Sequence, residues 1–220
     1  MSVRSENLSS VKRWIVGITG ASGTIYARRL LETLLEIDPL VEIDLVVSEA
    51  GLRVLREEEG FHTRVDRSEL KSLIGIETPR VRMHRNRDIG ASIASGSYPT
   101  EGMVVIPCSM STLAAIASGY SQTLIHRAAD VTLKEGRPLL LVPRETPLSP
   151  IHLENMLRLS KLGVKIIPAM PGFYHQPQSI LELVDMMVMR VLDQMGFQSS
   201  LVKRWGVGES EGELWPLRKI

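Results

Sequence analysis

The chain has 220 residues, 44% of them hydrophobic and 23% charged, which is typical of a globular protein that can bury a core of its own. Its 26 basic and 25 acidic side chains leave a formal net charge of +1. A balance so close to zero argues against a nucleic-acid backbone or an anionic membrane as the main partner. Cys108 is the single cysteine, which excludes an intrachain disulfide and a zinc site built from several cysteines. The chain has neither a run approaching ~20 apolar residues nor a signal-like start, so we expect a cytoplasmic protein.

Strand-like and helix-like patterns alternate along the chain. We predict strands over 14–19, 42–48, 103–107, 138–143 and 164–168. We predict helices from Gly23 to Pro39 and over 49–59, 112–118, 124–135, 152–162 and 180–195, whereas 60–100 has no clear pattern. Strands separated by helices predict a parallel sheet covered on both faces, and ligands of such sheets bind at the carboxyl ends of the strands.

Polar groups follow every predicted strand. The loop GITGASG (17–23) has glycines at 17, 20 and 23, which is not the dinucleotide-binding spacing, but its free N–H groups suit an anion unless the glycines serve only a tight turn. The other strand ends carry Ser48, the hydroxyls of 109–112, Arg144 with Glu145, and Tyr174 with His175. Each has a simpler explanation, such as a helix cap, a surface ion pair or a rigid connector. Five such ends together favour one shared site for a phosphorylated ligand.

Several cations strengthen the expectation of a phosphate ligand. They occur between 127 and 144 and at the border of the apolar stripe of the last helix: Arg127, Lys134, Arg137, Arg144 and Arg190. A cation beside a buried face is usually paired or bound to an anion. We therefore expect these side chains to gather around one or two phosphate groups.

Four stretches together resemble the flavin prenyltransferases of the UbiX type. They are GITGASG, PCSMSTLAAIASG (107–119), the series RAADV, LKE, RPL and RE within 127–145, and FYHQP (173–177). The resemblance runs from about Trp14 to Gly206 and is weak over 60–92. It implies a flavodoxin-like, Rossmann-like three-layer α/β/α fold with a mostly parallel sheet. It also implies one flavoprotein domain over 1–220 with flexible ends at 1–12 and 207–220, assembled as a homododecamer with sites at subunit junctions.

The family's reaction joins the dimethylallyl group of dimethylallyl phosphate to N5 and C6 of reduced FMN and releases phosphate. The resemblance implies no metal, and it implies that the prenylated FMN serves a UbiD-type decarboxylase. The implied FMN-binding residues are Gly20, Ala21, Ser22, Ser48, Ser109, Met110, Ser111, Thr112, Arg127 and Arg144. The implied substrate-binding residues are Ser95, Gly96, Lys134, Glu145, Tyr174, Arg190 and Trp205. His126 departs from the family pattern and is given no role.

The resemblance also implies roles in the chemistry for Ser22, Glu58, Lys134 and Glu145. Lys134 supplies positive charge to the leaving phosphate and Glu145 a proton, while Ser22 and Glu58 form a relay that removes a proton from the flavin. Two alternatives are a flavin-dependent cysteine decarboxylase of the same fold and a subunit that only stores FMN. The strand end at 107–110 and the RE and FYH motifs argue against the first, and a complete second phosphate site argues against the other.

Overall fold

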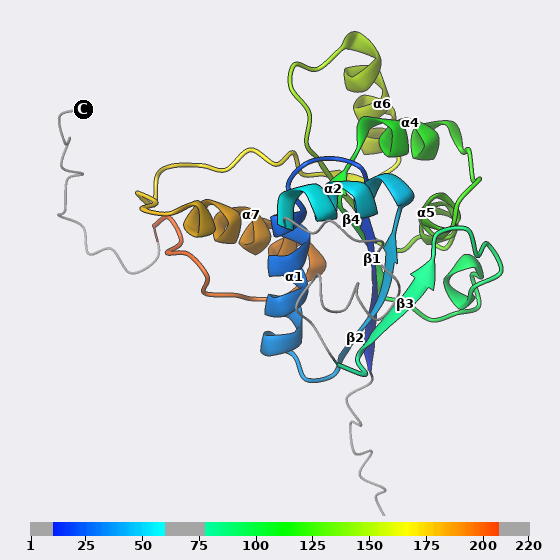
Figure 1. Ribbon diagram of the computed structural model, residues 1–220, viewed down its shortest axis with the longest axis horizontal. Helices are drawn as coiled ribbons and strands as arrows, with labels where there is room; N and C mark the ends of the chain where they lie inside the picture. Colours follow the sequence, from blue (N-terminus) through cyan, green and yellow to red (C-terminus); the bar gives the residue numbers. More distant parts are fainter. Residues whose placement is uncertain (1–10, 60–77, 207–220) are drawn as a thin grey trace, which may run out of the picture.

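The computed structural model describes residues 11–59 and 78–206 (Figure 1). It contains a six-stranded sheet. All its neighbouring strands are parallel, and their order is β3-β2-β1-β4-β5-β6. The strands are β1 (Lys12–Ile18), β2 (Val41–Val47), β3 (Val81–Arg85), β4 (Gly102–Cys108), β5 (Leu139–Pro143) and β6 (Lys165–Ile166). All seven residues of β4 are buried. A strand covered on both faces needs such a continuous apolar run, which explains why the pattern was predictable.

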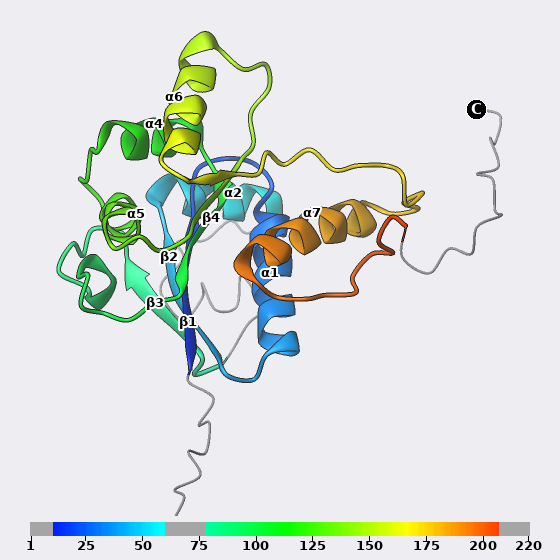
Figure 2. The same cartoon turned by 180° about the vertical axis from the view of Figure 1, so that it is seen from behind.

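Helices cover both faces of the sheet and make it the middle of three layers (Figures 1 and 2). The helices are α1 (Thr24–Ile37), α2 (Glu49–Glu59), α4 (Met110–Ser118), α5 (Leu124–Lys134), α6 (Pro150–Lys161) and α7 (Ile180–Met195), with a 3-10 turn η1 (Ser92–Ala94). Alternate residues of one strand face different helices. Trp14, Val16 and Ile18 of β1 pack in the core with α1 and α7, whereas Ile15 packs in the core with α4 and α5. The expectation of a flavodoxin-like α/β/α fold is therefore confirmed.

Serine and threonine caps fix the points at which the chain enters the helices on the second face. Ser109, Thr123 and Ser149 each accept a hydrogen bond from a backbone N–H in the first turn of α4, α5 or α6. Such a cap satisfies a donor that has no partner inside the helix. Because β4 leads directly into the cap of α4, the first turn of α4 stands at the carboxyl end of the sheet.

The main difference from the sequence prediction is β3, at the edge of the sheet. Only Val81 of this strand is fully buried, and its other residues are basic or half-exposed. An edge strand needs one apolar side at most, so VRMHR carried no recognisable strand pattern. At the opposite edge β6 is two residues long, against the five predicted.

The predicted flexible ends fall mostly outside the described residues. Residues 1–10 and 207–220 belong to those undescribed ends, whereas Lys12 begins β1 and pairs with Val41. Within residues 11–59 and 78–206, no helix has the length and apolar character needed to cross a membrane.

Candidate active site

A pocket of about 490 Å³ opens at the carboxyl end of the sheet. Five of the predicted FMN-binding residues line it, from three segments that follow different strands: Gly20, Ser48, Ser109, Ser111 and Thr112. The strand-end rule predicted this convergence from sequence positions far apart in the chain. The start of α5 also contributes to the wall, through Thr123, Ile125 and His126.

The first turn of α4 is the part of this pocket best suited to an anion. The hydroxyl of Ser109 lies 3.1 Å from the hydroxyls of both Ser111 and Thr112. Thr19 holds this turn in place, because its Oγ1 accepts from the backbone N of Ser109 at 2.7 Å and donates to the carbonyl of Pro107 at 2.9 Å. The first backbone N–H groups of a helix have no intrahelical acceptor, and together with these hydroxyls they favour a phosphate. The side chain of Met110 points instead into the buried core.

The turn between β1 and α1 passes so close to α2 that it requires glycine. A Cβ atom on Gly20 would lie 2.5 Å from Cβ of Ala50, far inside the normal contact distance. The neighbouring Ala21 is buried, and the side chain of Ser22 is exposed. This close packing keeps the backbone of the turn at the rim of the pocket, where a flat ligand can lie against it.

Glu58, near the end of α2, binds the start of α1. Its carboxylate accepts from the backbone N of Gly23 and of Thr24, both at 2.8 Å, and from Oγ1 of Thr24 at 2.6 Å. Partial burial acts to raise the pKa of Glu58, but hydrogen bonds from Ser22, Thr24 and the backbone outweigh it and lower the pKa below its ordinary value. Arg144 reaches the same turn from the end of β5 and donates from Nε to the carbonyl of Ser22 at 3.1 Å.

Two further predicted residues occur near this end of the sheet without lining the pocket. Glu145 follows Arg144 and is exposed, and its carboxylate accepts from the backbone N of Thr146 at 3.0 Å. Arg127 of α5 pairs with Asp130 at 2.8 Å. The neighbouring His126, to which the sequence analysis assigned no role, does line the pocket.

The predicted substrate-binding residues Ser95, Gly96 and Lys134 lie at the other end of the sheet. Ser95 and Gly96 precede the first residue of β4, and Lys134 ends α5 just before β5 begins. A Cβ atom on Gly96 would lie 2.9 Å from Nζ of Lys134, so the three residues form one cluster. The five residues of β5 separate this cluster from Arg144, a length of about 17 Å at the usual rise of a parallel strand. Within one chain Lys134 and Arg144 therefore lie too far apart to bind the same phosphate, and they can serve two different phosphates, as their separate assignments to the prenyl donor and to FMN imply.

The remaining predicted residues belong to the C-terminal part of the described chain. The rings of Tyr174 and Trp205 meet edge to face, with centroids 5.8 Å apart. Tyr174 also packs in a cluster that includes Tyr26, on the first turn of α1. Arg190 of α7 is exposed and pairs with Asp193 at 3.0 Å. Figure 1 shows the segment before α7 extending away from the sheet, past α1.

Sequence reasoning missed Asn86 and its role in shaping the pocket. Asn86 directly follows β3, is 6% exposed and lines the pocket. Its backbone carbonyl accepts from the backbone N of Leu124 at 2.7 Å. Its side-chain Oδ1 accepts from the backbone N of Ile125 at 3.2 Å, and its Nδ2 donates to the carboxylate of Glu49 at 3.2 Å. Asn86 thus ties α5 and α2 together. The only signal available was its position after a strand, and that strand was not recognised.

His126 presents a neutral ring to the same pocket. Burial lowers the pKa of His126, because it disfavours the charged form of the ring. Its Nδ1 is buried and has no hydrogen-bond partner among the described residues. The ring lies 6.5 Å from that of Tyr120, another residue of the pocket wall.

Comparison with known proteins agrees with this geometry. A family model described as Flavoprotein matches residues 2–192. A flavin prenyltransferase UbiX from Halalkalibacterium halodurans is 49% identical over 193 residues, which cover 88% of this chain and 93% of that protein.

Two solved structures have a TM-score of 0.78 to this chain. One is a dodecameric FMN-dependent UbiX-like decarboxylase from Escherichia coli O157:H7, 46% identical, with 88% of this chain and 98% of that one covered. The other is AnUbiX (PadA1) in complex with FMN and dimethylallyl pyrophosphate, 39% identical, with 90% and 99% covered. The peptidyl-cysteine decarboxylase EpiD, at 15% identity and a TM-score of 0.55, shares the fold alone.

The three-layer fold, the hydroxyl-lined pocket at the strand ends and the matching family model define a flavoprotein. More closely, the chain belongs to the flavin prenyltransferases, because it matches members of that family at 43–49% identity over most of its length. Among residues 11–59 and 78–206 there is no group of three or more His, Cys, Asp or Glu side chains arranged to hold a metal ion.

Proposed function

We propose that this chain is a flavin prenyltransferase that joins the dimethylallyl group of dimethylallyl phosphate to N5 and C6 of reduced FMN. The observation that carries the proposal is the convergence of five of the ten implied flavin-site residues on one pocket, with the Ser22–Glu58 pair on the turn that Gly20 begins. The Ser22–Glu58 pair favours an enzyme over a protein that only stores FMN, since storage requires no charged group to accept a proton beside the turn.

The pocket has the donors that FMN needs. The first turn of α4 offers the hydroxyls of Ser109, Ser111 and Thr112 to the phosphate. The close turn at Gly20 gives the flat ring system a backbone surface on which to lie. When bound in its reduced form, FMN supplies the electron-rich ring that the prenyl group joins.

The chain's own residues have to stabilise the departing phosphate and supply its proton. Lys134 and Arg190 provide fixed positive charge, and Tyr174 donates a hydrogen bond. Glu145 gives a proton to the phosphate as the bond to the prenyl group breaks. The pocket also has to exclude water, which would otherwise capture the allylic fragment, and Trp205 beside Tyr174 is suited to cover it.

A proton must leave C6 of the flavin after attachment, and the Ser22–Glu58 pair is suited to receive it. The hydrogen bonds that lower the pKa of Glu58 keep its carboxylate charged at neutral pH. Because Ser22 donates to this carboxylate, its hydroxyl can pass a proton from the flavin edge to Glu58.

The separation of Lys134 from Glu145 along β5 supports an assembly with shared sites. We infer that Ser95, Gly96 and Lys134 of one subunit complete the phosphate site of a neighbouring subunit within a homododecamer. The dodecameric relative from Escherichia coli O157:H7 supports this assembly. The product would pass to a UbiD-type decarboxylase, and we expect both proteins in the cytoplasm.

The reaction can be tested by incubating the protein with reduced FMN and dimethylallyl phosphate without oxygen. Mass spectrometry is expected to detect FMN carrying one five-carbon unit, together with released phosphate. A parallel incubation uses dimethylallyl pyrophosphate to distinguish the two donors. If neither donor yields an adduct, the proposal is wrong, and release of carbon dioxide from a peptide ending in cysteine would favour the decarboxylase alternative.

A matched pair of variants tests the proton donor. Glu145→Gln should bind FMN normally but release phosphate at least ~10²-fold more slowly, as is typical when a general acid is lost. Glu154→Gln changes an exposed glutamate of α6 and is expected to react like the wild type. Normal turnover by Glu145→Gln would exclude this role for Glu145.

A further inference from the structure

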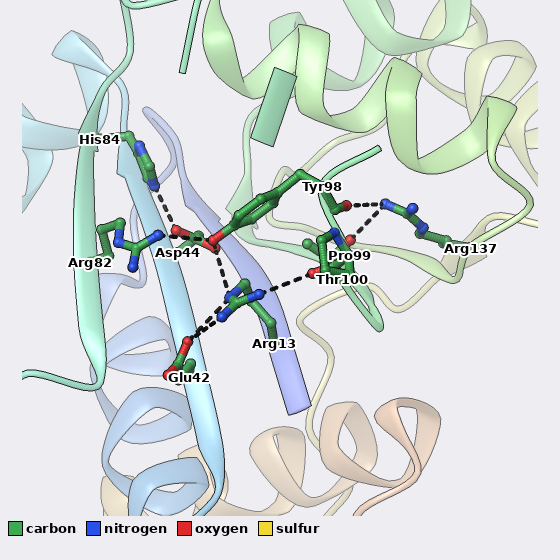
Figure 3. Close-up of polar contacts among 9 residues, drawn as sticks. All are labelled: Arg13, Glu42, Asp44, Arg82, His84, Tyr98, Pro99, Thr100 and Arg137. Carbon is green, nitrogen blue, oxygen red and sulfur yellow. Dashed lines mark hydrogen bonds and ion pairs between the residues drawn. The ribbon is translucent and has the colours of Figure 1, made fainter. Parts of the chain in front are cut away.

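A buried carboxylate interrupts the apolar middle of the sheet. Asp44 lies in β2, is 1% exposed and is surrounded by three partners from other segments (Figure 3). Nε2 of His84 lies 2.6 Å from its Oδ1, the hydroxyl of Tyr98 donates to its Oδ2 at 3.0 Å, and Nε of Arg13 lies 3.8 Å from Oδ2. A buried charge is costly unless it is paired and hydrogen-bonded, so this cluster has to hold its partners in definite places.

Tyr98 is the partner that comes from a loop rather than from a strand. Besides donating to Asp44, its hydroxyl accepts from Arg82 at 3.0 Å, and the guanidinium of Arg13 stacks over its ring at 4.9 Å. Burial and the charge of Asp44 raise the pKa of Tyr98, which keeps the hydroxyl protonated as a donor. The segment from 95 to 100 is thus tied to the sheet by Tyr98 and by Arg13, which also donates to the carbonyl of Pro99 at 3.4 Å (Figure 3).

Arg137 ties down the same segment from the opposite side. It donates to the carbonyl of Tyr98 at 3.0 Å and to the hydroxyl of Thr100 at 3.1 Å (Figure 3). It also donates to the carbonyl of Gly96 at 2.8 Å. Three hydrogen bonds from one rigid guanidinium fix both position and orientation. Lysine, with a single ammonium group, could not reproduce this arrangement.

Between these two anchors the chain displays a turn of exposed hydroxyls. Ser95 and Ser97 are exposed, and their Oγ atoms lie 2.9 Å apart. The backbone of Gly96 lies against the ion pair of Lys134 and Glu135, because a Cβ atom there would meet Oε1 of Glu135 first and Nζ of Lys134 at 2.9 Å. The exposed hydroxyls and the ammonium group of Lys134 offer donors to an anion, for which Lys134 has to exchange its pairing with the carboxylate of Glu135.

We propose that Tyr98 and Arg137 are positioning residues that hold Ser95, Gly96 and Lys134 in the arrangement that binds the phosphate of the prenyl donor. This inference rests on the proposed function and deepens it. Neither side chain touches the donor, since Tyr98 points to Asp44 and Arg137 to backbone carbonyls of the turn. Asp44 acts one step further away, as the fixed point to which Tyr98 is bound.

Two variants and a matched control test this positioning role in the full-length assembled protein. Tyr98→Phe removes one hydroxyl and keeps the ring under Arg13, while Arg137→Gln removes the fork that holds the turn. Arg80→Gln is the control, because Arg80 likewise donates to two backbone carbonyls, those of Leu35 and Asp38, but does not contact the turn. The measurements are KM for dimethylallyl phosphate, kcat, inhibition by inorganic phosphate, FMN affinity and the assembly's mass.

Both test variants are expected to raise KM for dimethylallyl phosphate and weaken inhibition by inorganic phosphate, each about tenfold, as when a hydrogen bond to a charged group is lost. FMN affinity, kcat and assembly should stay within twofold of the wild type, and Arg137→Lys should recover part of the loss. The control is expected to leave all five quantities unchanged.

The outcomes separate this inference from the proposed function. If the wild type does not prenylate FMN, the proposed function is wrong. If the wild type reacts and both variants keep its KM, the positioning role is wrong while the function stands. If the variants lose FMN affinity, or if their assembly dissociates, to the same extent as KM for the donor rises, Tyr98 and Arg137 serve general stability and the inference is overturned.

Discussion

Replacing Glu58 by glutamine tests the chain's most densely hydrogen-bonded candidate catalytic group. The N-cap residue of helix α1, which Glu58 contacts, is Gly23; it offers no side-chain cap, and the first turn of the helix contains no acidic residue. Glu58 supplies both missing elements from α2, since it accepts from Gly23 N, Thr24 N and Thr24 Oγ1 at 2.6–2.8 Å. It is an external cap and an external negative charge at the positive end of the helix.

The magnitude follows from what glutamine keeps and loses. One amide oxygen can still accept, but the amide NH₂ then faces donors, and the charge is gone. Loss of a cap costs about 0.5–2 kcal/mol, and the charge at a helix start is worth about 0.3–1 kcal/mol. Because the side chain of Glu58 is partly open to water, we expect a free energy of unfolding lower by about 1–2 kcal/mol. The loosened turn should also weaken FMN binding about tenfold, equivalent to about 1.4 kcal/mol.

The assay compares Glu58→Gln with Glu57→Gln by denaturant unfolding and by quenching of FMN fluorescence. Glu57 is the neighbouring residue of the same helix, and its carboxylate pairs with the exposed Arg53 at 2.8 Å. The control should therefore lose much less stability and no flavin affinity. Equal losses in the two variants would refute the idea that Glu58 organises the flavin turn.

The pH dependence gives an independent check. Hydrogen bonds lower the pKa of Glu58 in the folded chain below its ordinary value of 4.5, so the folded state binds this proton less readily than the unfolded state. The stabilisation by Glu58 is then fully present above pH 4.5 and is lost as the pH falls through the lowered pKa. Unfolding curves of the wild type and Glu58→Gln should differ at pH 7 and converge in acid. A difference that grows as the pH falls would contradict this sign.

Three further substitutions or treatments test other parts of the structure. Gly20→Ala would bring a Cβ atom within 2.5 Å of Cβ of Ala50, so we expect FMN affinity to fall at least ~10-fold while circular dichroism stays unchanged, and normal affinity would contradict the close packing. Cys108 is fully buried with its pKa raised to about 12, so an aromatic disulfide reagent at pH 8 should label it only after denaturation, and rapid labelling of the folded protein would refute this. Ser149→Ala removes the cap shared with His152 and should lower the free energy of unfolding by about 1 kcal/mol in a denaturant titration, whereas no change would mean that water replaces the cap.

Periodicity predicted the central part of the fold because burial there is complete. β4 is buried at every position, and α7 keeps an apolar stripe that packs on α1 and the sheet. The same reasoning fails at the edges. Only Val81 of β3 is buried, so the sequence of this strand carries little apolar signal, and with it Asn86 directly after the strand went unnoticed.

The site could be predicted from the sequence where a general rule relates the position of a residue in the chain to its position in the fold. Parallel strands point the same way, so Gly20, Ser48 and Ser109 had to meet once their strands were identified. No such rule indicates the partner of a side chain on a helix. Glu58 was assigned through family resemblance alone, and its contact with Ser22 and Thr24 depends on how α2 packs beside α1.

The placement of Lys134 and Arg144 at opposite ends of the sheet follows from the same geometry, although their closeness in the sequence suggested that they lie together. Lys134 and Arg144 are near one another in the chain, but β5 runs between them from one end of the sheet to the other. In a βαβ unit the end of a helix and the end of the following strand always lie at opposite edges. A site that uses both groups therefore needs two copies of the chain. In the shared site that we propose, the flavin pocket of the same chain cannot hold the Ser95–Gly96 turn in place, so this turn needs rigid support of its own from Tyr98 and Arg137.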